Sequence, residues 1–277
     1  MTETRTLTTA VLASLALLAA TPTPAGHADT LRCREIRSVP FTIDSPGVYC
    51  LDRSISTPME AGVAILIAAD DVTLDLAGFT LAGTADTDTK ADGIVAEGRR
   101  NVTVRDGTVT GFLRGVSLAS VGGNLVERIR AHGNFRVGIH ASGHGSIIRR
   151  NQVIATGGGK ETALWTGIGA AGPGVRIIDN DVIDTADPGE GFAVDAINVA
   201  DANGAVIEGN RLANQFLPPH VLGITIFDSS GVLAVNNRIT NFPKGITYLG
   251  ATGKYRDNLT FGVASPFDGG TDAGNNN

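Results

Sequence analysis

The chain has 277 residues, of which 42% are hydrophobic and 18% charged, so it carries enough apolar material for a packed core and is not a disordered chain. Glycine occurs 36 times without a three-residue period, which excludes collagen and is typical of a chain with many tight turns. The formal net charge of −6 makes the protein a poor candidate for binding DNA or RNA through its overall electrostatic field.

Residues 1–28 have the pattern of a cleaved signal peptide. Arg5 supplies a weakly positive start, residues 7–20 form an apolar run, and Ala28 closes a small-x-small cleavage site, with Ala20 as an alternative. The run is shorter than a membrane span requires, and no later segment is longer and equally apolar. We therefore expect a secreted or periplasmic protein that has no membrane segment after the signal is cleaved.

The only two cysteines, Cys33 and Cys50, follow the signal. In an exported protein, two cysteines at this separation predict one disulfide. A metal site is the alternative, but after the predicted cleavage at Ala28 no histidine lies near either cysteine in the sequence. Both cysteines fall in residues 29–61, which contain two short strand-like pieces and which we expect to form an N-terminal β cap that covers the first coil of the repeat described next.

From residue 62 onward, one unit recurs eight times. Each unit begins with a small residue and a short strand of alternating apolar positions, and a glycine-rich turn then leads to a second strand. A polar residue follows 13 or 14 positions after the start, before a third short strand. Successive starts are separated by 22 residues (Gly93 to Gly115) to 31 residues (Gly62 to Gly93). The starts are Gly62, Gly93, Gly115, Gly138, Gly167, Ala196, Gly223 and Gly245.

Such a unit cannot bury its apolar face alone, so neighbouring units must stack. The units lack a helical period, which excludes helical and leucine-rich repeats and predicts a parallel β-helix of about eight coils over residues 62–264. The recurring polar residues fit a ladder at one turn, a structural role; they are Asp75, Asp106, Arg128, Asn151, Asn180, Asn210, Asn237 and Asn258. The polar residues 265–277 are expected to form a disordered tail.

The repeat over residues 62–262, with the segments FTIDSPGVYCLDRSIS and ILIAADDVTLDLAGFTLAG, resembles the right-handed parallel β-helix superfamily, the pectin-lyase-like proteins, and in particular exported bacterial β-helix repeat proteins. The resemblance implies an all-β, right-handed parallel β-helix. It does not imply one activity, because this fold carries many. No group of aspartates reproduces the calcium site of the pectate lyases, so we expect no cofactor and leave calcium open.

The lengths of the connections between coils indicate where a site would lie. Long connections at residues 82–92, 156–166, 185–195 and 214–222 flank short ones before Gly115 and Gly138, so we expect an open cleft over coils two to four. The alternation of apolar and polar residues in the first strand of its coil places the His140 side chain on the outward side, at the floor of this cleft. The candidate residues on the cleft floor are Asp92, Glu97, Arg114, Arg136 and His140. Lys160 and Trp165 lie on the adjoining loop, and Asp195 and Asn198 lie in a later coil.

These residue types suit the removal of the proton α to a uronate carboxylate, as in a polysaccharide lyase or C5-epimerase. Arg114 and Arg136 can bind the carboxylate through two parallel hydrogen bonds, and His140 has a pKa suited to a general base, with Lys160 as an alternative. The remaining residues would bind substrate; they are Trp165, Glu97, Asp92, Asp195 and Asn198. For Trp165, loop packing and sugar stacking both stay open.

Two other functions compete with this one. A glycosidase with two carboxylates is less favoured, because Asp92 and Glu97 lie about four coils from Asp195, beyond the usual separation of about 5 to 9.5 Å. The other is a non-catalytic glycan- or protein-binding β-helix of the cell envelope or exterior, which the short chain favours. Whether the protein is an enzyme therefore stays open, and the expected partner is a polysaccharide bound by a monomer.

Overall fold

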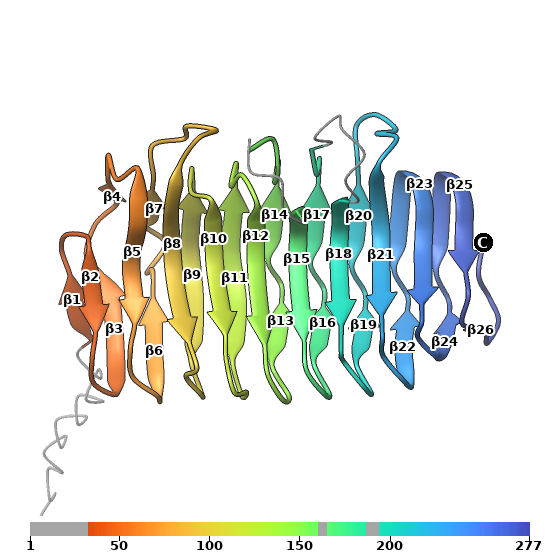
Figure 1. The fold of residues 1–277 in the computed structure, drawn as a ribbon, viewed down its shortest axis with the longest axis horizontal. Helices are drawn as coiled ribbons and strands as arrows, with labels where there is room; N and C mark the ends of the chain where they lie inside the picture. Colours follow the sequence, from red (N-terminus) through yellow and green to blue (C-terminus); the bar gives the residue numbers. More distant parts are fainter. Residues whose placement is uncertain (1–32, 160–164, 187–193) are drawn as a thin grey trace, which may run out of the picture. The chain divides into compact units, whose positions relative to one another are not determined.

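The computed structural model describes residues 33–159, 165–186 and 194–277, so the predicted signal peptide lies outside the described residues. The described residues belong to one compact unit, Cys33–Asn277, built from β-strands and turns. No helix long and apolar enough to cross a membrane occurs among them. The strands pair in parallel from coil to coil, which confirms the predicted parallel β-helix (Figure 1).

Each complete coil contributes one strand to each of three faces. The first face contains β2 (Phe41–Ile43), β5 (Ala61–Ile67), β8 (Lys90–Glu97), β10 (Arg114–Ala119), β12 (Val137–Ser142), β15 (Trp165–Ala171), β18 (Val194–Ala200), β21 (Val221–Phe227) and the second halves of β23 (Arg238–Leu249) and β25 (Leu259–Asp268). The eight predicted repeat starts lie in these strands, from β5 to β23, so each predicted unit is one coil.

The other two faces are built in the same way. The second face contains β1 (Arg34–Ile36), β3 (Gly47–Leu51), β6 (Val72–Asp75), the first halves of β9 (Thr103–Thr110) and β11 (Leu125–His132), β13 (Ile147–Arg149), β16 (Arg176–Ile178), β19 (Val206–Glu208), β22 (Val232–Val235), β24 (Gly253–Arg256) and β26 (Thr271–Asp272). The third face contains β4 (Ile55–Ser56), β7 (Thr80–Ala82), the second halves of β9 and β11, β14 (Gln152–Ile154), β17 (Asp181–Ile183), β20 (Arg211–Ala213) and the first halves of β23 and β25.

The core lies between the three faces and is made mainly of isoleucine and valine side chains stacked along the coils, together with leucine and alanine. On the first face, aligned residues form a buried column that contains Ile65, Ile94, Val116, Ile139, Ile168, Ile197, Ile224 and Ile246. Beside this column lie the glycines that start the repeat units. A Cβ on Gly138 would lie 2.5 Å from Val153 Cγ1, and one on Gly167 would lie 2.7 Å from Val182 Cγ1. The small residue is therefore required by close packing against the third face.

The predicted asparagine ladder is present from Asn151 to Asn258. The backbone N–H and the side-chain Nδ2 of each of Asn151, Asn180, Asn210 and Asn237 donate to Oδ1 of the next asparagine, at 2.9 to 3.1 Å. Each Nδ2 also donates to a backbone carbonyl, such as Ile148 O for Asn180, at 3.0 Å. All these groups are buried and paired, so the ladder holds the turn between the second and third faces.

The ladder does not extend toward the N-terminus as predicted. In the coil of β11, the register places Ile129, rather than Arg128, beside Asn151, and the Ile129 N–H donates to Asn151 Oδ1 at 2.9 Å. Arg128 and Asp106 lie one residue earlier, both with a positive φ, and form an ion pair on the surface. The predicted rungs Asp106 and Arg128 are therefore wrong by one residue, and a shift of one residue moves a side chain from the interior to the surface. The predicted rung Asp75 aligns with Arg105, forms an ion pair with it and also lies outside the ladder.

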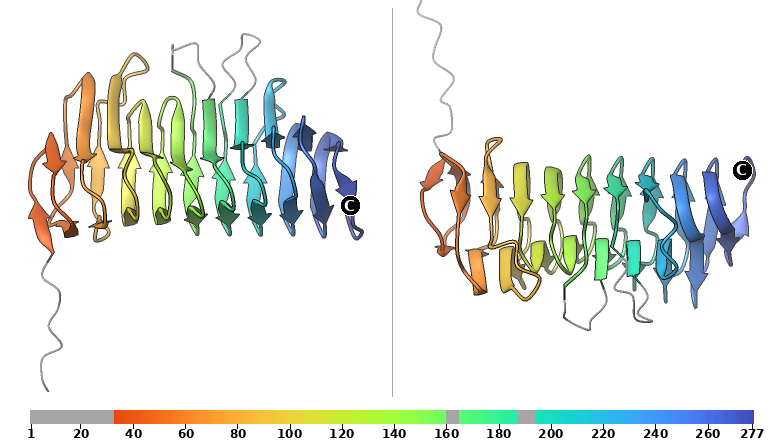
Figure 2. Two further views of the ribbon diagram at one scale, coloured as in Figure 1. Left: turned by 60° about the horizontal axis from the view of Figure 1, so that its bottom comes forward. Right: turned by 90° about the horizontal axis from the view of Figure 1, so that it is seen from above.

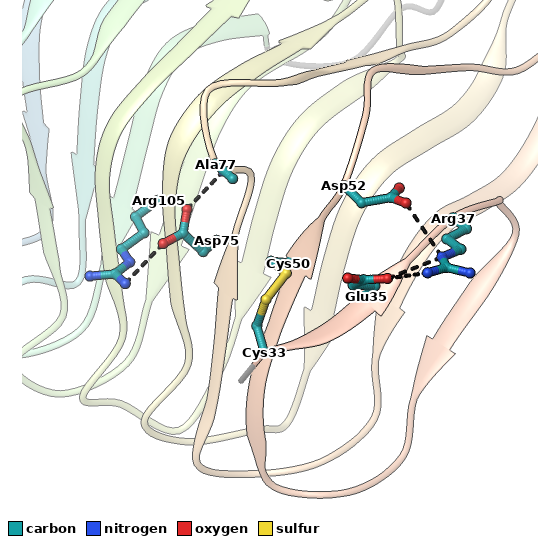
Figure 3. The surroundings of a disulfide bond; sticks show 8 residues. All are labelled: Cys33, Glu35, Arg37, Cys50, Asp52, Asp75, Ala77 and Arg105. Carbon is teal, nitrogen blue, oxygen red and sulfur yellow. Dashed lines mark hydrogen bonds and ion pairs between the residues drawn. A yellow bond between two sulfur atoms is a disulfide. The ribbon is translucent and has the colours of Figure 1, made fainter. Parts of the chain in front are cut away.

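The segment predicted to cap the first coil forms a coil of the same kind. β2, β3 and β4 pair with β5, β6 and β7, and β1 pairs with β3 at the outer edge. The predicted disulfide joins Cys33, next to β1, to Cys50 in β3, with the Cα atoms 5.6 Å apart (Figure 3). On the same strands Arg37 forms ion pairs with Glu35 and Asp52. The disulfide and these pairs fix the N-terminal edge of the coil stack.

The disordered tail predicted for residues 265–277 is wrong. Residues 265–268 complete β25, and β26 pairs with β24. Asn276 continues the asparagine ladder, because its Oδ1 accepts hydrogen bonds from Asn258 N and Nδ2 at 3.1 and 3.0 Å. The ring of Phe267 stacks on Tyr255 with centroids 4.7 Å apart. A polar, glycine-rich composition is therefore compatible with order here, since the asparagines supply ladder contacts.

The connections from the third face back to the first differ in length as predicted. Residues 111–113 and 133–136 make short turns before β10 and β12, whereas residues 83–89 and 214–220 make longer loops (Figure 2). The connections after β14 and β17 begin with the described residues 155–159 and 184–186. The described parts of these connections follow the third face and so lie along one edge of the coil stack.

Candidate functional site

The outward side of the first face carries two columns of side chains, which we call the outer columns. One contains Arg114, Val137, Thr166, Asp195 and Leu222, with Asp92 beside Arg114. The other contains Val95, Ser117, His140, Gly169, Asn198, Thr225 and Thr247. Because aligned residues repeat at about 4.8 Å, side chains from adjacent coils come within contact distance.

Arg136, one of the predicted site residues, does not lie in either outer column. The register pairs Val137 with both Arg114 and Thr166, so Arg136 precedes the column by one residue and lies in the turn before β12. Its backbone N–H donates to Leu113 O at 2.8 Å, and its carbonyl accepts from Thr166 N at 3.0 Å. Its Nε atom is buried and has no hydrogen-bond partner among the described residues. Arg136 therefore lies beside the candidate site, and no described residue pairs with its Nε–H.

Arg114 is held by a double hydrogen bond to Asp92. Its Nε lies 2.9 Å from Oδ1 and its Nη2 lies 2.6 Å from Oδ2 of that carboxylate. Asp92 is only 7% exposed, whereas the Arg114 guanidinium reaches solvent. The hydrogen bonds that Arg114 donates to Asp92 raise the pKa of Arg114 further above its usual range, although burial opposes this effect. Two of the predicted site residues thus come together as a neutral pair.

His140 lies on the outer side of β12, half-buried and next to the space above Gly169. A Cβ on Gly169 would lie 2.9 Å from His140 Nδ1, so the absence of a side chain at this glycine makes room for the imidazole. Burial lowers the pKa of His140 below its usual value, and the positive charge of Arg114 lowers it further. The imidazole is therefore neutral at neutral pH and can accept a proton.

Asp195 and Asn198 form a third polar group, on β18. Asp195 is 2% exposed; its Oδ2 accepts from Asn198 Nδ2 at 2.8 Å, and its Oδ1 accepts from the Thr225 hydroxyl of the next coil. Burial raises the pKa of Asp195, and its hydrogen bonds to Thr225 and Asn198 oppose this shift. Asn198 is separated from His140 by the single coil that carries Gly169. His140, a potential base, and Asp195, a potential acid, therefore lie on the two strands that flank β15.

The remaining predicted residues contribute less. Glu97 ends β8 and is exposed, and its charge acts on Arg114 over a distance. Trp165 begins β15, where its backbone pairs with Val194, and Lys160 lies outside the described residues. The coils of β10, β12 and β15 separate Asp92 and Glu97 on β8 from Asp195 on β18, about 19 Å along the stack. A glycosidase with these carboxylates as its pair is therefore not favoured.

Two contributors to the site were not singled out by sequence reasoning. Thr225 binds the carboxylate of Asp195, and Gly169 provides the space occupied by His140. Both lie in the same outer column as His140, so a column-by-column alignment of the repeats could have found them. Within residues 33–159, 165–186 and 194–277, no group of three or more acidic, histidine or cysteine side chains is arranged to hold a metal ion.

Comparisons with known proteins identify the fold family. Residues 92–261 match the family model described as the right handed beta helix region. Among solved structures, a tailspike protein from an Escherichia coli bacteriophage is 15% identical, with a TM-score of 0.46, and the match covers 85% of this chain but only 37% of the tailspike. A search of curated proteins gave no significant match.

Two further structures have comparable similarity. The A-module of a mannuronan C-5 epimerase from Azotobacter vinelandii is 16% identical, with a TM-score of 0.42 and coverage of 83% of this chain and 80% of that one. A pectate lyase is also 16% identical, with a TM-score of 0.43 and coverage of 83% and 69%. At these identities the likeness concerns the fold alone. The family model, which spans more than half of the sequence, shows that the chain belongs to the right-handed β-helix family.

Proposed function

We propose that the protein binds a uronate-containing polysaccharide along the outer columns and removes the proton α to a uronate carboxylate, as a lyase or a C5-epimerase. The observation that carries this proposal is the environment of His140. This histidine is half-buried on the outward side of the first face, and both burial and the charge of Arg114 lower its pKa. A neutral imidazole is the form that a general base requires.

In the proposed reaction, His140 accepts the proton from C5 of the uronate, and the electron pair of the broken C–H bond moves onto the carboxylate. In a lyase, the C4–O bond then breaks, the ring gains a double bond and the leaving oxygen takes a proton. In an epimerase, C5 is protonated from the opposite side. Asp195 fits the role of proton donor, since burial raises the pKa of its carboxyl.

The anion formed on the carboxylate requires a cation. Arg114 already donates Nε–H and Nη2–H to Asp92, so we assign the carboxylate contact to Arg136, whose Nε has no partner among the described residues. Arg114 then acts through its charge, which disfavours protonation of His140. In this arrangement Arg114 is a positioning residue, and Arg136 contacts the substrate.

Turnover of uronans tests the proposal. The purified protein is incubated with polygalacturonate, polymannuronate and polyguluronate, and products are followed by the ultraviolet absorbance of unsaturated sugars and by NMR detection of deuterium at C5. His140→Ala should lower turnover by about 100-fold or more. His144→Ala is the matched control, because His144 is exposed in the turn after the same strand. Equal turnover by the two variants would exclude His140 as the base.

Non-catalytic glycan binding is the second candidate, and the Arg114–Asp92 pair favours it. The two N–H groups that would bind a substrate carboxylate in parallel are occupied by Asp92. Binding of uronans that remain chemically unchanged after long incubation would support this candidate. In that case Arg136→Ala should weaken binding, whereas His140→Ala should leave binding within about twofold of the wild type.

A further inference from the structure

A groove lies between residues 184–186, directly after β17, and residues 214–218, after β20, outside the candidate site. It has a volume of about 290 Å³ and is lined by Asp184, Thr185, Ala186, Asn214, Gln215, Phe216 and Pro218. Ligand pockets in proteins begin at about 300 Å³, so the groove has room for a group the size of one sugar ring. One aromatic ring and three side chains with amide or carboxylate groups line it.

Asn214 supplies a buried hydrogen-bond donor at this groove. The residue is 5% exposed, and its Oδ1 accepts from the Thr185 N–H at 3.0 Å, which fixes the orientation of the amide. Its Nδ2 atom is buried and has no hydrogen-bond partner among the described residues. A buried amide without a partner costs about 1 to 3 kcal/mol, so a ligand acceptor at this point would remove a penalty.

Asn134 shows that the same side chain is fully paired in an equivalent turn. Its Oδ1 accepts from Phe112 N at 3.2 Å, and its Nδ2 donates to Val109 O at 3.1 Å, both in the preceding coil. In the coil of Asn214 the first of these contacts is kept and the second is not made. Asn134 lies before β12, and Asn214 lies in the longer loop before β21, beside the groove.

Phe216 supplies an apolar surface beside this donor. Its side chain is 75% exposed, although water contact is unfavourable for an aromatic ring of this size. A pyranose ring has one face of C–H groups and a rim of hydroxyl groups, each of which can donate and accept. The ring of Phe216, the Nδ2 of Asn214 and the carboxylate of Asp184 offer matching partners for that face and that rim.

We propose that this groove is a binding subsite for a neutral sugar residue of the polysaccharide. Among the described residues, the lining includes one carboxylate, Asp184, and no basic side chain, so a uronate would meet a like charge without a compensating cation from them. The inference rests on the proposed function in one respect, that the ligand is a polysaccharide. It extends that function by predicting a substrate in which neutral sugars accompany uronates.

Binding of oligosaccharides to the whole chain tests the subsite. Calorimetry is run with neutral hexasaccharides of β-1,4-glucose, β-1,4-mannose and α-1,4-glucose, and with hexasaccharides of galacturonate and mannuronate. Phe216→Ala should weaken binding of at least one neutral sugar by about tenfold or more and leave uronate binding within about twofold. The matched control is Phe261→Ala, because Phe261 is 76% exposed and does not line the groove; this variant should bind like the wild type.

A second variant removes the donor and keeps the turn. Asn214→Asp retains an oxygen for the Thr185 N–H and replaces the donor Nδ2 with an acceptor, so neutral sugar binding should again fall by about tenfold. If this variant does not fold, Phe216→Ala decides alone, because its side chain is exposed.

Three results would overturn the subsite: no neutral oligosaccharide is bound, Phe216→Ala and Phe261→Ala behave alike, or the binding that depends on Phe216 is tightest for uronates or for unstructured peptides. The proposed function fails separately. Uronan turnover that depends on His140, without neutral sugar binding that depends on Phe216, would keep the function and exclude the subsite. The reverse result would keep the subsite and exclude the uronate reaction.

Discussion

The asparagine ladder and the outer columns both consist of polar side chains repeated from coil to coil, yet they have different properties. In the ladder, Asn151, Asn180, Asn210 and Asn237 pair along the stack through both amide atoms and the backbone. In the outer columns the residue type changes from coil to coil, from His140 to Gly169 to Asn198. Identical, fully paired side chains hold a turn, whereas a varied row with shifted pKa values is suited to a ligand.

Removal of one ladder asparagine should have the largest effect on stability. Asn180→Ala leaves the Ile148 carbonyl and the N–H groups of Asn151 without partners in the interior, so the free energy of unfolding should fall by about 3 to 4 kcal/mol. Urea unfolding measures this loss. Asn203→Ala is the control, because Asn203 is exposed and its side-chain Oδ1 accepts from the N–H and hydroxyl of Ser230 at the surface; the cost of this change should stay below about 1 kcal/mol.

The same variant sharpens the distinction between ladder and site. At a temperature where Asn180→Ala remains folded, its glycan binding should equal that of the wild type, because the ladder lies between the second and third faces. Lost binding with an unchanged urea midpoint would show that the asparagines contact the ligand.

The disulfide should stabilise the N-terminal end of the coil stack, which the asparagine ladder does not reach. Replacement of both Cys33 and Cys50 by serine should lower the free energy of unfolding by about 3 kcal/mol, because the bond closes a loop with a sequence separation of 17. Thiol titration of the denatured, unreduced wild type should detect no free thiol. Two free thiols per chain would contradict the pairing.

Breaking the Arg114–Asp92 pair tests whether Arg114 in the outer columns can bind a ligand. The substitution should change the stability of the protein and its affinity for the ligand in opposite directions. Asp92→Asn leaves the guanidinium with a weaker partner, which should cost about 1 to 2 kcal/mol in a urea titration. The same change frees Arg114, so the affinity for oligogalacturonate should rise. Unchanged affinity, with the loss of stability present, would exclude direct contact between Arg114 and the ligand.

The smallest expected effect is a pH dependence from His140. Since burial lowers its pKa below the usual value of about 6.5, the unfolded chain binds more protons than the folded chain just below that pH. The stabilisation is therefore complete above about pH 6.5 and is lost as the pH falls toward the folded pKa. The difference in unfolding free energy between the wild type and His140→Gln should decrease from pH 8 to pH 5. A difference that increases on acidification would contradict the proposed environment of His140.

The sequence by itself determined the coil. The small residue at each start, the alternating apolar positions and the asparagines from Asn151 onward follow from what each coil needs from its neighbours: close packing at Gly138 and Gly167, burial of one strand face, and partners for buried turn groups. The single disulfide was equally predictable, because Cys33 and Cys50 are the only cysteines.

Only the tertiary structure decided how side chains of different coils meet. The turn before β12 removes Arg136 from the outer column, Asp92 pairs with Arg114, and Thr225 binds Asp195 across coils. These contacts depend on the register, and a shift of one residue reverses the direction of a side chain, whereas the repeat tolerates connections of varied length. The ordered C-terminus was decided in the same way, because Asn276 forms ladder contacts only when the preceding coil is in place.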